Sequence, residues 1–227
     1  MIDRTFDARP SLDPRNAGYP ARPLLGVTAP RPRSYTWSCY ARLDQGREGS
    51  CVGHGWAHEL AAKPKPVPNV TGALAVDIYR AAQHIDEWPG ADYEGTSVNA
   101  GAKILRDRKL LDEWRWAASP EETVTIVGHH GPVVLGVPWL EGMRGTDPNG
   151  HVLPVGELLG WHCVILHAVR VDRGFPRASV FTGLNSWGTG WGVDGMFRLT
   201  AAGLGTLMDM GGEVCVPVVR RLPKDVR

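Results

Sequence analysis

The sequence has few cysteines, almost no net charge and no long apolar run. Its four cysteines lie far apart in 227 residues and form no C-x-x-C pair, so the sequence predicts neither a disulfide framework nor a zinc knuckle. The formal net charge is +1, with acidic and basic residues interspersed. The chain therefore has no excess of positive charge that would attract a phosphate backbone or an anionic membrane surface. We therefore expect neither nucleic acid nor a membrane as a partner, and no cofactor. The oligomeric state stays open.

The N-terminal segment MIDRTFDARPSLDPRNAGYP likewise lacks the apolar stretch of a signal peptide or a membrane span. We expect a cytoplasmic protein in a reducing compartment. Residues 1–34 are rich in proline and arginine and show little periodicity. This composition predicts an extended arm that lies on the body of the protein or is partly disordered, and that is not a domain.

Three segments in the first half of the chain predict helices. Apolar residues at helical spacing, without proline, run from Cys51 to about residue 62 and end at KPKPVP. Similar patterns predict helices over 73–84 and 97–108, separated by the turn-rich EWPGADYEGT. Alternating aromatic and polar residues over 35–43 predict a short strand before the first helix.

Beyond residue 113, short apolar runs bounded by glycine and proline replace the helical pattern. They are GPVVLGVPWL, WHCVILHAVRV, ASVFTGLNSWG, GMFRL and EVCVPVVRRL. Such runs are typical of an antiparallel sheet or a small barrel. The sequence therefore predicts an α+β fold, with one domain over 35–227. Its helical lobe would cover about 45–113 and its sheet lobe about 114–220, with a cleft between them.

The segment LDQGREGSC places Cys51 where the first predicted helix begins. A thiol is mostly protonated at neutral pH, and the free backbone amides of a first helical turn favour the thiolate. Gln45 precedes Cys51 by six residues across a glycine-containing loop. This spacing lets the Gln45 side-chain amide and the Cys51 backbone amide donate to one oxyanion. Cys51 is therefore a candidate nucleophile, and Gln45 a candidate oxyanion donor.

The remaining requirement is a base and a group that orients it. His162 starts the strand-like HCVILHAV, and Asn185 follows the next strand in GLNSWGTGWG. Adjacent antiparallel strands would bring these side chains together, with the Trp187 indole shielding their contact from water. Because neighbouring side chains of a strand alternate in direction, His167 faces the other side and would need a change of register to replace His162.

Each candidate also has a purely structural interpretation. Free cysteines are often buried small hydrophobes, and this interpretation stays open for Cys51. Taken alone, His162 would be a strand histidine with its hydrogen bonds satisfied, Asn185 a turn residue and Gln45 a surface residue. The two tryptophans, Trp187 and Trp191, would be core aromatic residues. We assign a packing role to Trp191 and to the remaining cysteines, Cys39, Cys163 and Cys215.

A metal site is the sharper alternative for the first helix. His54 and His58 stand four residues apart on one helix face and could bind zinc together with Cys51. The sequence places no acidic or further cysteine ligand nearby, so we predict no metal. His129 and His130 precede a Gly-Pro pair and are predicted to lie in a solvated turn.

Four ordered motifs resemble the papain family of cysteine peptidases. QGREGSC resembles the segment in which a glutamine lies six residues before the nucleophilic cysteine. GWHCVIL resembles the histidine strand, and NSWGTGWG matches the asparagine motif almost letter for letter. EGTSVNAG is more loosely similar to a glycine-rich substrate-binding stretch, and GPVVLGV to a strand across the cleft. The resemblance extends from about residue 35 to about residue 199.

The resemblance implies a papain-like fold with a helical lobe, a barrel-like antiparallel lobe and the active site between them. It implies Cys51 as nucleophile, His162 as general base and then acid, and Asn185 as the group that orients His162. It also implies Gln45 as oxyanion donor.

The same resemblance implies three substrate-binding residues. Gly95 would offer backbone groups to an extended substrate, because a residue without a side chain lets another chain approach closely. Gly136 would face a specificity pocket. Trp187 would cover the contact between the histidine and the asparagine.

Some positions depart from the family pattern. Val52 stands where the family usually has an aromatic residue, and Glu48 where it has a cysteine, so the usual disulfide is absent. The segment before Cys51 is also shorter than a folded inhibitory propeptide requires. In these departures the chain resembles the proregion-free bacterial and phage-encoded relatives of the family. If the chain is phage-encoded, the expected location is the cytoplasm of the host cell.

We thus expect a cysteine peptidase that hydrolyses peptide or protein substrates through an acyl-enzyme at Cys51. Two alternatives stay open. One is a catalytically reduced binding module of the same fold, and the other is a transpeptidase, transglutaminase or amidase with the same Cys–His chemistry. Glu94 and Asn99 flank the predicted cleft, but they do not predict a side-chain specificity.

Overall fold

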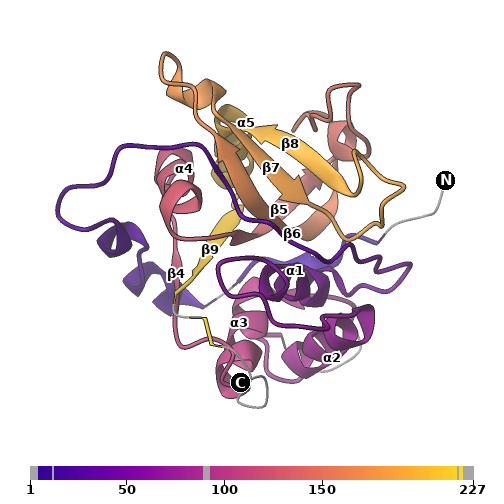
Figure 1. Ribbon diagram of the computed structural model, residues 1–227. Coiled ribbons are helices and arrows are strands. Elements are labelled where there is room, and N and C mark those ends of the chain that lie inside the picture. The colour runs from indigo at the N-terminus through magenta and orange to yellow at the C-terminus, as the bar shows by residue number, and fades with distance from the viewer. Residues whose placement is uncertain (1–4, 12, 89–92, 219, 222–227) are drawn as a thin grey trace.

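A computed structural model describes residues 5–11, 13–88, 93–218 and 220–221 (Figure 1). The α-helices are α1 (Cys51–Leu60), α2 (Gly72–Gln83), α3 (Val98–Asp107), α4 (Pro120–His129) and α5 (Ala201–Asp209). The strands are β1 (Ala8–Arg9), β2 (Tyr35–Thr36), β3 (Thr96–Ser97), β4 (Trp114–Trp116), β5 (Val133–Leu140), β6 (Leu158–Arg170), β7 (Val180–Leu184), β8 (Met196–Thr200) and β9 (Glu213–Pro217). Short 3₁₀ turns lie at Pro14–Gly18, Arg22–Leu25, Glu141–Met143 and Pro176–Ala178.

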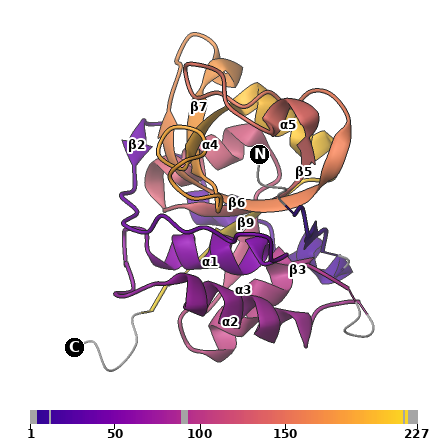
Figure 2. The same ribbon diagram turned by 90° about the vertical axis from the view of Figure 1, so that its right-hand side faces the viewer.

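Helices α1, α2 and α3 form one layer of the molecule, below the sheet in Figure 2. Thr71 caps α2 by accepting the Leu74 amide, and Ser97 caps α3 by accepting the Ala100 amide. The three helices predicted for the first half of the chain are confirmed, with ends that differ by no more than two residues.

Helix α1 is buried along its whole length, between α2 and the sheet. A Cβ at Gly53 would lie 2.0 Å from the Ala75 carbonyl oxygen of α2. On the other side, a Cβ at Gly55 would lie 2.6 Å from the Cys163 sulfur of β6. Two glycines therefore let α1 pack against both neighbours, which fixes the position of its first residue relative to β6.

The main sheet has the strand order β4–β9–β5–β6–β7–β8, with β2 added to β6. Every pairing in it is antiparallel. The five predicted strand segments correspond to β5 through β9, so the mixed helical and antiparallel architecture is confirmed. The sheet does not close into a barrel, because β4 and β8 at its two ends are not paired with each other in the described residues.

Alternate residues of β6 face two separate cores. Val164 and Leu166 pack into a core shared with α4 and α5, whereas Cys163 and Ile165 pack into a core shared with α1. The two-residue period of a strand produces this division. By the same period, His162 lies on the side of Val164.

Helices α4 and α5 were not predicted. In α4, Ser119 accepts the Glu122 amide and Pro120 occupies the first helical position, a start signal that was readable in the sequence. Two glycines inside α5 weakened its helical pattern. The solvated turn predicted at His129 is wrong, because that residue is the last of α4 and His130 is its cap.

The N-terminal arm lies on the body of the protein. Strand β1 pairs in parallel with β3, and Arg33 Nε donates to the Gly128 carbonyl at 2.6 Å. The strand predicted over 35–43 is shorter in the structure: β2 holds Tyr35 and Thr36, and the Trp37 amide makes one further bond to the His167 carbonyl of β6 at 2.9 Å. The domain and lobe boundaries stay predictions. Within the described ranges, no helix is both long and apolar enough to cross a membrane.

Candidate functional site

Cys51 is the first residue of α1 and is completely buried. Burial raises the pKa of its thiol to about 12, and the negative charge of Asp7 acts in the same direction. Backbone hydrogen-bonding groups of Cys163, Asp7 and Val52 oppose this shift. The helix start alone led us to expect a lowered pKa. In this structure desolvation outweighs the backbone amides.

His162 and Asn185 are in contact. His162 Nε2 lies 2.8 Å from Asn185 Oδ1, and both side chains are buried. Because an amide oxygen only accepts hydrogen bonds, the imidazole carries a proton on Nε2. The Ser186 backbone amide also donates to Asn185 Oδ1, at 2.7 Å. The asparagine oxygen is thereby held in place, and it fixes both the orientation and the tautomer of the ring.

Aromatic rings surround the His162 imidazole. The Trp187 ring is 4.9 Å away between centroids and tilted by 31°, and the Trp139 ring is 4.9 Å away and nearly perpendicular. Trp191 packs edge-on against Trp187 with centroids 5.1 Å apart. Trp187 therefore packs against the imidazole, and its role of shielding the contact between His162 and Asn185 stays a prediction. Trp139 was missed, although the predicted strand GPVVLGVPWL contains it.

Gln45 is tied to the segment that holds Asn185. Its side-chain oxygen accepts from the Ser186 hydroxyl at 2.6 Å, and its backbone amide donates to the Ser186 carbonyl at 2.8 Å. Its side-chain nitrogen donates to the Glu48 carbonyl at 3.0 Å. Ser186 thus orients the Gln45 amide, a role that sequence reasoning missed although Ser186 stands inside the NSWGTGWG motif.

Residues 5–9 of the arm run through this site, in close contact with three glycines. A Cβ at Gly95 would lie 1.6 Å from the Asp7 carbonyl oxygen, and one at Gly49 would lie 2.9 Å from the Asp7 carboxylate. A Cβ at Gly160 would lie 2.6 Å from Phe6 Cβ. Gly95 was predicted to admit an extended peptide backbone, and the backbone that it meets here belongs to the chain's own arm.

The arm also contacts the candidate catalytic residues directly. The Phe6 ring packs edge-on against His162 and Trp187, with centroids 6.0 and 5.7 Å away. The Thr5 hydroxyl donates to the Glu48 carbonyl at 3.2 Å, beside the Gln45 amide. The arm therefore covers Cys51, His162 and the predicted oxyanion donor.

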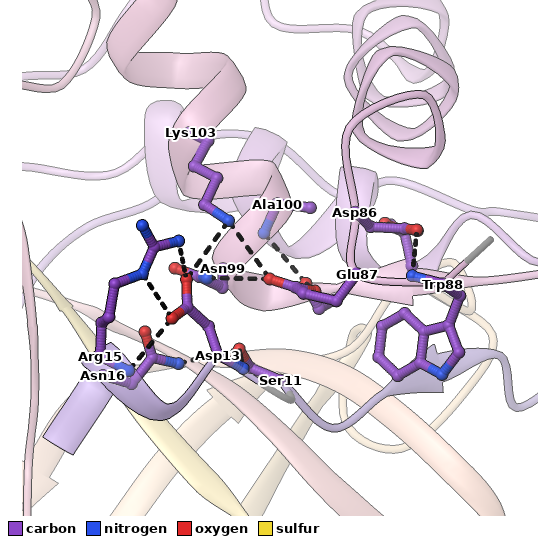
Figure 3. A network of polar contacts seen from close by, with 12 residues as sticks. Ser11, Asp13, Arg15, Asn16, Asp86, Glu87, Trp88, Asn99, Ala100 and Lys103 are labelled. Atoms are coloured by element: carbon purple, nitrogen blue, oxygen red, sulfur yellow. Dashed lines mark hydrogen bonds and ion pairs between the residues drawn. The ribbon is translucent and has the colours of Figure 1, made fainter.

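Farther along, the arm is anchored to α3 by charged groups (Figure 3). Asp13 lies 3.6 Å from the Lys103 ammonium, which is also 3.3 Å from Glu87. Hydrogen bonding to Arg15 lowers the pKa of Asp13, so this carboxylate stays charged. Asn99, which flanks the predicted cleft, donates to Glu87 at 3.1 Å.

Gly136 lies inside β5, opposite Cys163 on β6 and Glu213 on β9. A Cβ at Gly136 would lie 3.1 Å from Glu213 Oε1. Burial raises the pKa of Glu213 to about 8, opposed by a backbone hydrogen bond from Ser11 of the arm. Gly136 therefore lies beside an acid to which the arm is hydrogen-bonded, and the specificity pocket at Gly136 stays a prediction.

The histidines of the alternative metal site both have protein partners. His58 Nε2 accepts from the Leu43 amide at 3.1 Å, and His54 Nδ1 donates to the Ser50 carbonyl at 3.0 Å. Burial lowers the pKa of both rings. His167 donates from Nδ1 to the Trp37 carbonyl at 2.9 Å, away from Asn185.

No protein-family model matches the chain. A stretch of 70 residues is 37% identical to cathepsin B-like cysteine proteinase 6 of Caenorhabditis elegans. This stretch covers 31% of the present chain and 18% of that protein. The chain therefore spans less than a fifth of the length of this curated relative.

Solved structures of cysteine proteases share the architecture over most of the chain. Xylellain, a cysteine protease from Xylella fastidiosa, has a TM-score of 0.62 at 16% identity, covering 95% of this chain and 92% of that chain. The bromelain protease from Ananas comosus, solved with an inhibitor, has a TM-score of 0.57 at 13% identity, covering 83% and 100%. Procathepsin L 3 of Tenebrio molitor has a TM-score of 0.56 at 16% identity, covering 85% and 72%. The chain thus has a papain-like fold, as predicted.

Proposed function

We propose that the chain is a cysteine peptidase that its own N-terminal arm keeps latent. The observation that carries this proposal is the 2.8 Å contact between His162 and Asn185, with Gln45 hydrogen-bonded to the next residue, Ser186. Cys51 at the start of α1 is the thiol of the site. The papain-like fold and the short cathepsin B-like stretch support the same reaction class.

The proposed reaction divides hydrolysis into two steps. The Cys51 sulfur attacks the substrate carbonyl carbon, a thioester forms and the peptide C–N bond breaks, while His162 passes the thiol proton to the leaving amine. Water then attacks the thioester, and His162 takes a proton from the water and returns it to sulfur. Because Asn185 holds Nε2, His162 exchanges these protons at Nδ1.

Gln45 and the Cys51 backbone amide would stabilise the oxyanion formed in each step. In the covered state the Gln45 nitrogen donates to the Glu48 carbonyl. Release of Thr5 and Phe6 would uncover this nitrogen and the imidazole together. Peptide or protein substrate would then take the place of the arm along Gly95.

The direct test is hydrolysis of labelled casein by the full-length chain carrying Phe6→Ala, which weakens the arm. Adding Cys51→Ala should lower the rate by at least about a thousandfold, as expected for loss of a covalent nucleophile. Cys39→Ala is the matched control, because it removes another buried thiol outside the site. Casein cleavage that persists in the Cys51→Ala protein would overturn the proposal.

One observation favours the alternative of a binding module. A buried thiol with a pKa of about 12 is no nucleophile at neutral pH. If the Phe6→Ala chain binds peptides, hydrolyses none and leaves Cys51 unalkylated at pH 6, the binding module is the correct function. Incubation with amine donors separates hydrolysis from acyl transfer by the product mass.

A further inference from the structure

Arg9 of the arm lies in a cage of two aromatic rings at the edge of the cleft. Its guanidinium carbon is 4.4 Å from the Tyr93 ring centroid and 5.4 Å from that of Trp88. Its Nε donates to the Glu94 carbonyl at 3.2 Å. Two π faces and an in-plane acceptor suit a planar cation.

A single carboxylate holds this cage in shape. Asp86 accepts from the Trp88 amide at 3.1 Å, from the Thr96 hydroxyl at 2.8 Å and from the Tyr93 hydroxyl by a short hydrogen bond. Figure 3 shows the contact between Asp86 and Trp88. The rings are thus braced against β3, the strand that carries the arm, by contacts that do not involve Arg9.

The position of the cage relative to the site suits a substrate side chain. Arg9 is two residues after Asp7, whose backbone meets Gly95 and lies next to Cys51. An extended peptide along β3 presents a side chain to the same side at every second residue. A hollow of about 370 Å³ beside Arg9, lined in part by Trp88, Glu94 and Trp161, leaves room for other side chains.

We propose that Trp88, Tyr93 and the Glu94 carbonyl form a subsite for a cationic side chain of the peptide substrate, with arginine preferred to lysine. Arg9 occupies this subsite in the latent protein. The inference rests on the proposed peptidase function and names the substrate class of that same cleft. It also explains why the braced rings of Trp88 and Tyr93 both face a guanidinium.

The competing interpretation is that the cage only fastens the arm. The two interpretations separate in a full-length chain carrying Arg9→Ala, where the cage is empty of its own arginine. A fastening role changes the rate for all peptides equally. A subsite changes the ranking of peptides, because only those with a cation in the right position gain from the rings.

The experiment digests matched peptides in which arginine or the uncharged isostere citrulline stands at each position in turn, followed by mass spectrometry. In the Arg9→Ala chain we expect about a tenfold preference for arginine in kcat/KM at one position. Trp88→Leu or Tyr93→Leu should reduce it to less than about twofold. Tyr93→Phe, which keeps the ring but loses its hydrogen bond to Asp86, should reduce it less than Tyr93→Leu. Phe175→Leu, at an exposed ring elsewhere, should leave it unchanged. Absence of any such preference, or its persistence in both leucine variants, would overturn the subsite.

Failure of the peptidase function would be recognised separately. If no variant cleaves any peptide, binding of fluorescent arginine and citrulline peptides to the Arg9→Ala chain tests the cage directly. Tighter binding of the arginine peptide, lost in Trp88→Leu, supports the subsite without catalysis. Equal binding of the two peptides contradicts it.

Discussion

Helix α1 and the N-terminal arm meet at Cys51, but they are held in the molecule by different forces. All ten residues of α1 are buried, and its glycines touch the backbone of α2 and a side chain of β6. The described residues of the arm within 5–13 contribute one buried apolar side chain, Ala8, and are otherwise held by a two-residue parallel pairing, a phenyl ring, a caged guanidinium and an ion pair with Lys103. Burial of this kind is lost only on unfolding, whereas a few polar and aromatic contacts can open locally. We therefore expect the site to stay formed when residues 5–13 of the arm open.

The largest expected effect comes from the packing of α1. Gly53→Ala places a methyl group 2.0 Å from the Ala75 carbonyl, so one helix must move. We expect the free energy of unfolding to fall by roughly 3 kcal/mol or more, measured by urea denaturation. Gly72→Ala is the matched control, since Gly72 begins α2 and has nothing within 4 Å of its Cβ position. Equal stability of the two variants would contradict tight packing of α1.

The next effect concerns the imidazole. Asn185→Ala removes the acceptor of His162 Nε2 while leaving the aromatic rings around it. We expect kcat for peptide hydrolysis in the Phe6→Ala background to fall about 10- to 100-fold, less than for Cys51→Ala, because orientation is one part of the barrier. Far-UV circular dichroism should be unchanged. An unaltered kcat would mean that this contact has no role in catalysis.

The smallest effect belongs to the ion pairs of the arm. Lys103→Met removes the cation shared by Asp13 and Glu87, and should speed Cys51 alkylation by about two- to fivefold at low salt. The difference should shrink at high ionic strength, which screens the pair in the unmodified chain. Arg108→Met removes an ion pair between the residue that follows α3 and Asp77 of α2, and should leave the alkylation rate unchanged. Equal acceleration by both variants would rule out a specific anchor.

The parts of the molecule that the sequence predicted are those whose partners are near in sequence or lie in regular strands. The helix starting at Cys51 follows from its apolar spacing, and the meeting of His162 with Asn185 follows from neighbouring antiparallel strands. Helix α4 had a readable start at Ser119 and Pro120 that was overlooked.

The arm could not be placed in this way. Phe6 reaches His162 across more than 150 residues of sequence, and no periodicity in the arm indicates which surface it covers. The helix start predicts a lowered pKa for Cys51, and the pKa rises instead because burial in the folded chain removes water from the thiol. Ser186 orients Gln45 through contacts that depend on the exact approach of two loops.

The central claim is that the arm covers a competent thiol, and the pH dependence of Cys51 alkylation by iodoacetamide tests it most directly. With a pKa of about 12, the thiolate fraction of the unmodified chain rises about tenfold per pH unit. Its alkylation rate should therefore rise without a plateau between pH 6 and pH 10. In the Phe6→Ala chain the rate should be higher at every pH in this range and should level off below pH 9. Identical profiles for the two proteins would contradict the account.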